Sequence, residues 1–127
     1  MNEIIKKYHS FQKFNNFEQN IIKAERALNT FNLALNEFYK KKIIANNKLI
    51  DLGSGNENLV KLAKKKNIRA KGYDFDSINL EFSKIPEENN SADYVTCISL
   101  IEHLKDPSNL LKEVYRILKP EGILIIV

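Results

Sequence analysis

Hydrophobic residues recur every three or four positions in the first third of the chain. The recurring positions are Ile21, Ala24, Leu28, Phe31, Leu35 and Phe38. This spacing is the period of one face of an α-helix, so it predicts an amphipathic helix over residues 18–42. A turn follows at residues 45–47. We expect the aromatic residues of this stripe to pack in the core or over a substrate site.

The pattern changes at Lys48, where short apolar runs begin to alternate with segments of helical spacing. Residues 48–52, 94–99 and 123–127 are mainly apolar runs of strand length, and residues 68–73 predict another strand. Residues 58–66 predict a helix between the strands at 48–52 and 68–73. A second helix begins at Asp106, a capping residue, with Pro107 in the first helical position. Its expected core face is Leu110, Leu111, Val114, Ile117 and Leu118, and Pro120 and Gly122 end it. Alternating strands and helices predict an α/β fold with a parallel sheet and right-handed crossovers.

The stretch between Asp76 and Asp93 has no room for an ordinary helix and strand. Ile78, Leu80 and Phe82 alternate with polar residues, which favours a short strand or an extended loop. Residues 86–90 form a polar turn.

The first strand runs directly into Gly53-Ser54-Gly55, just before the helix at residues 58–66. Glycines adopt left-handed backbone angles and allow a ligand to approach the main chain closely. A strand, a glycine turn and a helix N-terminus form a common nucleotide-binding corner of α/β sheets. If the strand at 94–99 flanks the strand at 48–52, the crevice is lined by residues 51–55, 74–75 and 99–103.

Two carboxylates distinguish among nucleotide classes at this corner. Asn58 stands where a dinucleotide fingerprint requires its third glycine, and the Lys-Ser/Thr pair of a P-loop is absent. Asp51 disfavours a pyrophosphate and favours a ligand that carries an ammonium group. Asp74, about twenty residues after the glycine turn, suits a ribose diol. S-Adenosylmethionine has an ammonium group, a sulfonium and a ribose diol.

Four segments in order resemble those of the class I S-adenosylmethionine-dependent methyltransferases. They are residues 50–55, 72–74, 85–95 and 101–122, and the resemblance covers residues 48–127. It implies a Rossmann-like, mostly parallel sheet with helices on both faces, lacking the family's C-terminal strands. It divides the chain into an N-terminal helical segment, 1–47, and a cofactor-binding domain, 48–127. It also implies methyl transfer to a small-molecule, lipid or sugar acceptor.

The resemblance implies a set of cofactor-binding residues. Asp51, Gly53, Ser54 and Gly55 would hold the methionine portion. Asp74 would hold the ribose, with Phe75, Glu81 and Phe82 near the adenine and Ser99 and Leu100 under the sulfonium. Glu57 replaces the family's third glycine, which puts a negative charge near the cofactor's carboxylate.

Glu102 and His103 are the candidates for proton transfer. An imidazole can take a proton from a hydroxyl or amine acceptor as methyl transfer proceeds. A structural role is the alternative. Some relatives use a Glu-His pair as metal ligands, but the only other histidine is His9, so we expect no metal.

Charge and composition narrow the remaining possibilities. The net charge is +4, and the excess lies before Leu49, with nine basic and four acidic residues. The dense lysine runs, residues 40–42 and 64–66, lie near helix ends, where cations suit the helix dipole, so a nucleic-acid partner is not expected. The single cysteine, Cys97, lies in an apolar run, which suggests a buried thiol in a reducing cytoplasm. The chain shows no secretory signal peptide and no apolar run of membrane-spanning length.

The last apolar strand, from Ile123 to Val127, would be an exposed sheet edge. Such edges pair readily with other chains. We therefore expect a second copy or a partner chain to cover it. A second interpretation of the whole chain also stays open, as a non-catalytic methyltransferase-like module for binding or interaction.

Overall fold

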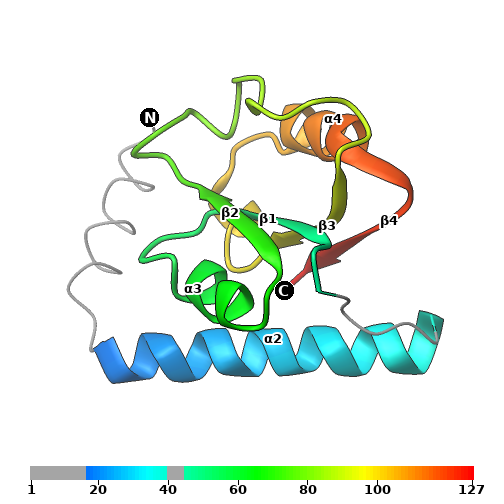
Figure 1. Ribbon diagram of the computed structural model, residues 1–127. Helices are drawn as coiled ribbons and strands as arrows, with labels where there is room; N and C mark the ends of the chain where they lie inside the picture. Colours follow the sequence, from blue (N-terminus) through cyan, green and yellow to red (C-terminus); the bar gives the residue numbers. More distant parts are fainter. Residues whose placement is uncertain (1–16, 40–44) are drawn as a thin grey trace.

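The computed structural model describes residues 17–39 and 45–127, as one α/β unit (Figure 1). Its elements are α2 (Phe17–Tyr39), β1 (Lys48–Leu52), α3 (Asn58–Lys65), β2 (Arg69–Tyr73), β3 (Ala92–Cys97), the 3₁₀ turn η1 (Ile101–His103), α4 (Ser108–Ile117) and β4 (Leu118–Ile126). The four strands are all parallel and lie in the order β2-β1-β3-β4. The predicted parallel sheet is confirmed, and the order reverses between β1 and β3, as a ligand crevice requires.

Helices cover both faces of this sheet, as predicted. Figure 1 shows α3 between the sheet and the long helix α2 on one side, and α4 on the other. Alternate residues of β1 serve the two faces: Leu49 packs with α2 and α3, whereas Ile50 and Leu52 pack with α4. All three side chains are fully buried. Burying each contributes roughly 1.5–3 kcal/mol to folding, so β1 joins the two halves of the core.

Helix α2 belongs to the same core as the sheet. Ala24, Leu28 and Leu35 of the predicted stripe are buried and share a cluster with Leu49 and Ala63. The side chains of Ile21, Phe31 and Phe38 lie outside the described residues, as does the predicted helical stretch at residues 40–42. The division at residue 47 stays a prediction. The described part of α2 nevertheless packs on the domain that follows it.

The stretch after β2 forms consecutive turns, so the predicted extended structure at Ile78, Leu80 and Phe82 is wrong. The Asp74 carbonyl accepts the N–H groups of Ser77 and Ile78, and the Asn79 carbonyl accepts that of Ser83. These turns bury Leu80 but leave Phe82 70% exposed, whereas a strand would put both on one face. Side-chain bonds within residues 74–81 favour the turns over a strand.

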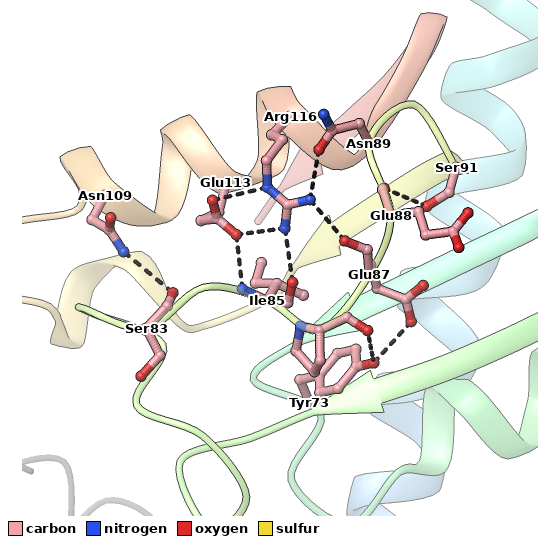
Figure 2. Close-up of polar contacts among 11 residues, drawn as sticks. Tyr73, Ser83, Ile85, Glu87, Glu88, Asn89, Ser91, Asn109, Glu113 and Arg116 are labelled. Atoms are coloured by element: carbon pink, nitrogen blue, oxygen red, sulfur yellow. Dashed lines mark hydrogen bonds and ion pairs between the residues drawn. The ribbon is translucent and has the colours of Figure 1, made fainter.

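Arg116 of α4 holds the loop at residues 85–89, which precedes this helix in the chain (Figure 2). Its guanidinium donates hydrogen bonds to the carbonyls of Ile85 and Glu87, each 2.7 Å long. Glu113, one turn earlier, pairs with Arg116 and accepts the Ile85 N–H at 2.7 Å. The loop therefore covers the α4 side of the sheet, where an ordinary crossover helix would pack.

Glu87 continues this clamp onto the sheet. Its carboxylate accepts a hydrogen bond from the Tyr73 hydroxyl at 2.8 Å and forms an ion pair with Lys48. Burial alone would raise the pKa of Glu87, but the bonds from Lys48 and Tyr73 outweigh it and hold the pKa below its usual value. The loop is thus tied to β1 and β2 as well as to α4.

Two predicted boundaries and one predicted core residue are corrected around β3 and α4. Strand β3 spans Ala92–Cys97, because Ser99 turns away with φ +50°. Helix α4 stops at Ile117 and Leu118 already starts β4, so Pro120 and Gly122 do not end the helix. Leu111 is 39% exposed and is not part of the core face. No helix within residues 17–39 and 45–127 is long and apolar enough to cross a membrane.

Candidate functional site

A pocket of about 390 Å³ opens at the carboxyl ends of β1 and β3, beneath helix α2. The described residues that line it come from four parts of the chain. They are Ala24, Arg26, Ala27 and Thr30 of α2, Asp51, Gly53, Ser54, Asn56, Asn58 and Leu59 of the glycine turn and its flanks, Ile98 and Ser99 after β3, and Val127. A volume of this size suits a small ligand or cofactor.

Asp51 supplies a buried carboxylate to this pocket. It is only 4% exposed, and its Oδ1 accepts a hydrogen bond of 2.6 Å from the Thr96 hydroxyl. The pairing of β1 with β3 sets this contact, because Asp51 and Thr96 are register partners on one face of the sheet. A buried carboxylate with one side-chain donor retains acceptor sites for a ligand.

Burial makes the Asp51 charge costly. Removal from water raises its pKa to about 7, with smaller increases from the charges of Asp74 and Glu57. The Thr96 hydroxyl acts in the opposite direction, because it stabilises the ionised form. A cation in the pocket would favour the ionised carboxylate in the same way.

The glycine turn has the left-handed geometry expected from its sequence. Gly53 has φ +79° and Gly55 has φ +52°. The N–H of Gly53 donates to the Tyr73 carbonyl at 2.8 Å, so the turn is anchored to the end of β2. Glu57, the substituted third glycine, has φ +58°, which is a conformation that suits glycine and strains other residues.

Asp74 holds the turn from the neighbouring strand. One carboxylate oxygen accepts the N–H of Gly55 and the other accepts that of Phe75, each at 2.7 Å. Asp74 is 8% exposed and is not among the residues that line the pocket. Its role at a ribose stays a prediction, and the structure adds a clear one in fixing the glycine turn.

Ser99 and Leu100 lie on opposite sides of the same corner. Ser99 lines the pocket, and its N–H donates to the Val127 carbonyl at 2.8 Å. Leu100 is buried beneath the turn, where a Cβ added to Gly53 would come within 3.2 Å of its side chain. A larger residue at position 53 would therefore press against Leu100 as well as strain the backbone.

The three residues assigned to the adenine lie away from the pocket. Phe75 is buried in the core on the α4 side, and Phe82 is exposed. Glu81 is 5% exposed, and its Oε1 accepts the N–H groups of Lys105 and Asp106 at 2.7 and 3.0 Å. Glu81 thus links the loop after β2 to the segment before α4, and adenine contacts by these residues stay predictions.

Glu102 and His103 lie in η1, outside the set of residues that line the pocket. His103 Nε2 is 3.7 Å from Glu102 Oε1, and the Glu102 side chain is 54% exposed. Their role in proton transfer stays a prediction. Among the described residues, no group of three or more His, Cys, Asp or Glu side chains is arranged to hold a metal ion.

Sequence reasoning missed several pocket residues. The sequence marks Asn56 only as a turn residue, and Asn58 only as a helix residue at the place of a missing glycine. Thr96, which is not among the lining residues but donates a hydrogen bond to Asp51, is recognisable only once β1 and β3 are aligned. Arg26 and Thr30 lie away from the apolar stripe of α2, so the helical pattern alone does not mark them.

Comparison with known proteins identifies the fold's family. The family model described as "Methyltransferase domain" matches residues 22–127, which include the pocket residues of α2, the glycine turn and the loop after β3. The chain belongs to this methyltransferase family. The resemblance found in the sequence is therefore confirmed, and the match also takes in most of α2.

Curated relatives of this methyltransferase-family chain are longer proteins. The ubiquinone/menaquinone biosynthesis C-methyltransferase UbiE of Rickettsia akari is 36% identical over 95 residues, covering 71% of this chain and 37% of the relative. The protein of the same name from Rickettsia bellii is 33% identical over 112 residues, covering 84% and 43%. The chain spans less than half the length of these relatives.

Solved structures share the fold. A phosphoethanolamine N-methyltransferase 2 from Haemonchus contortus, in complex with S-adenosyl-L-methionine, is 24% identical, with a TM-score of 0.60 over 76% of this chain and 27% of that one. A SAM-dependent methyltransferase from Aquifex aeolicus is 15% identical, with a TM-score of 0.58 over 80% and 70%. The Rossmann-like methyltransferase fold predicted from the sequence is confirmed.

Proposed function

We propose that the pocket beneath α2 binds S-adenosylmethionine and that the chain is the cofactor-binding part of a methyltransferase. The observation that carries the proposal is the buried Asp51 carboxylate, which faces the pocket beside a glycine turn at the sheet's switch point. A buried anion of raised pKa suits a cationic ligand better than a pyrophosphate. The family match supports the same cofactor.

The chain's own residues would bind and orient this cofactor. Asp51 would accept the ammonium group, and the turn from Gly53 to Gly55 would bring the backbone close to the ligand. When bound, S-adenosylmethionine supplies an electrophilic methyl group, which an acceptor atom takes while the electron pair of the broken C–S bond stays on sulfur. Positioning of the two reactants supplies most of the catalysis in such a transfer.

The acceptor would be a small molecule. The names of the curated relatives support a carbon acceptor on a quinone precursor, although the chain covers less than half of each. Acceptor-binding residues would come in part from the N-terminal helix α2, which lines the pocket. If His103 serves as a base there, His103→Ala should reduce turnover strongly without changing cofactor affinity, and unchanged turnover would reject that role.

Titration calorimetry tests the cofactor proposal directly. We expect S-adenosylmethionine and S-adenosylhomocysteine to bind with one site and micromolar affinity, and NAD⁺ to show no binding. Folded protein that binds neither adenosyl ligand would support the other interpretation, a non-catalytic interaction module.

Strand β4 forms one edge of the described sheet, and Ile126 is 52% exposed there. We propose that a second copy or a partner chain covers this edge, because unpaired strands with apolar side chains associate readily. The molar mass in solution, measured by light scattering, tests the second copy.

A further inference from the structure

Two charged side chains line the described part of the pocket, and they have opposite signs. Asp51 comes from β1, and Arg26 comes from the third turn of α2. The side chains of the other described lining residues are uncharged. A ligand that carries one ammonium and one carboxylate, as an amino acid does, would match both charges.

Arg26 occupies a suitable position for the anionic end of such a ligand. It is exposed on α2, and Thr30, one helical turn further on, adds a hydroxyl to the same lining. Asn56 and Asn58 add amide groups after the glycine turn. Guanidinium groups bind carboxylates through two parallel hydrogen bonds, which makes arginine well suited to this recognition.

The negative charge of Glu57 increases the need for a positive charge near a bound ligand carboxylate. Glu57 lies between Asn56 and Asn58, which both line the pocket, so its charge would oppose a ligand carboxylate there. The glycine turn, which in itself carries no charge, would then leave the carboxylate without an ionic partner. Arg26 supplies the compensating positive charge from α2.

We propose that Arg26 of α2 binds the carboxylate of the ligand's amino-acid moiety, and that α2 thereby selects α-amino-acid ligands over decarboxylated ones. The inference rests on the proposed cofactor function and deepens it. It also gives α2 a binding role in addition to its packing on α3 and the sheet.

The test compares two ligands that differ only in the carboxylate: S-adenosylmethionine and decarboxylated S-adenosylmethionine. Arg26→Gln should weaken S-adenosylmethionine binding by about tenfold or more, because a charge-assisted bidentate contact is lost. The affinity for the decarboxylated ligand should change less than about twofold. Arg26→Lys should retain part of the affinity, since it keeps the charge without the fork.

The matched control is Lys112→Gln, which removes one positive charge from an exposed site on α4, outside the pocket. It should leave both affinities unchanged. Glutamine and arginine have similar helix propensities, so Arg26→Gln should unfold at the same temperature as the wild type. Equal weakening of both ligands by Arg26→Gln would overturn the proposal. Failure of the wild type to bind either ligand would overturn the cofactor function and this inference with it.

Discussion

At the scale of single residues, the site contains a buried carboxylate that destabilises the free protein and that we expect to bind the ligand. Asp51 is buried beside an uncharged hydroxyl, and its pKa is raised to about 7. Glu57 lies nearby in a left-handed conformation. Both residues reduce the stability of the free protein, and the burial of Asp51 makes sense if a bound cation compensates for it.

Asp51→Asn should stabilise the free protein. Between pH 3.8 and about 7, the Asp51 carboxyl is protonated in the folded protein and ionised in the unfolded chain. Wild-type stability should therefore fall as pH rises through that range. The substitution would remove this loss and gain about 1 kcal/mol or more at pH 8. Urea unfolding at pH 5 and pH 8 measures both effects.

The same variant has an opposite effect on ligand affinity. Wild-type affinity for S-adenosylhomocysteine should rise as pH increases through about 7, because the ammonium group needs an ionised partner. Asp51→Asn should bind at least about tenfold more weakly, with this dependence lost. Thr96→Val, which keeps the carboxylate, should shift the dependence to higher pH. A wild-type affinity that does not vary with pH would contradict this account of Asp51.

Glu57→Gly should stabilise the protein by up to about 1 kcal/mol, because glycine adopts φ +58° without strain. The gain is limited by the greater entropy of glycine in the unfolded chain. Glu57→Gln is the matched control, since it removes the charge and keeps the strain. Both variants should lower the pKa of Asp51 and gain the same stability from that change, but the glycine variant should raise the melting temperature further because it also relieves the strain. Equal melting temperatures of the two variants would show that the left-handed angle costs little.

At the scale of elements, the loop after β2 takes the place of a crossover helix. Two of its carbonyls bond to Arg116 of α4 and the Ile85 N–H bonds to Glu113, while Glu87 accepts a bond from Tyr73 (Figure 2). Glu87 also pairs with Lys48. The Arg116 bond to Glu113 lowers the pKa of that carboxyl, so the pair is ionised at neutral pH. Side-chain hydrogen bonds therefore fix the conformation of this loop, as backbone hydrogen bonds would in a helix.

Arg116→Lys should destabilise the protein by about 2 kcal/mol, because a lysine cannot satisfy both loop carbonyls and Glu113 at once. Urea unfolding gives the change in free energy. Lys112→Ala, an exposed substitution on the same helix, should stay within about 0.5 kcal/mol of the wild type. If Arg116→Lys were as stable as this control, the clamp would contribute little to the fold.

At the scale of the whole molecule, the sequence predicted the parallel sheet and the position of the glycine corner. Apolar runs and period-3.6 patterns report which residues are buried, so β1, α3 and the face of α4 around Leu110 and Val114 were recognisable. The patterns failed where side-chain bonds decide the backbone, as in the turns after Asp74. They also could not place Arg26 in the pocket, because that depends on how α2 packs across α3.

The central claim is that the pocket beneath α2 is the cofactor site, and backbone amide NMR during a titration with S-adenosylhomocysteine tests it most directly. We expect saturable shift changes at Ala27, Gly53, Ser54 and Ser99, which line the pocket, and none at Tyr115, which is 85% exposed on α4. Changes confined to α4 and the loop that it holds, or no changes at all in folded protein, would contradict the claim.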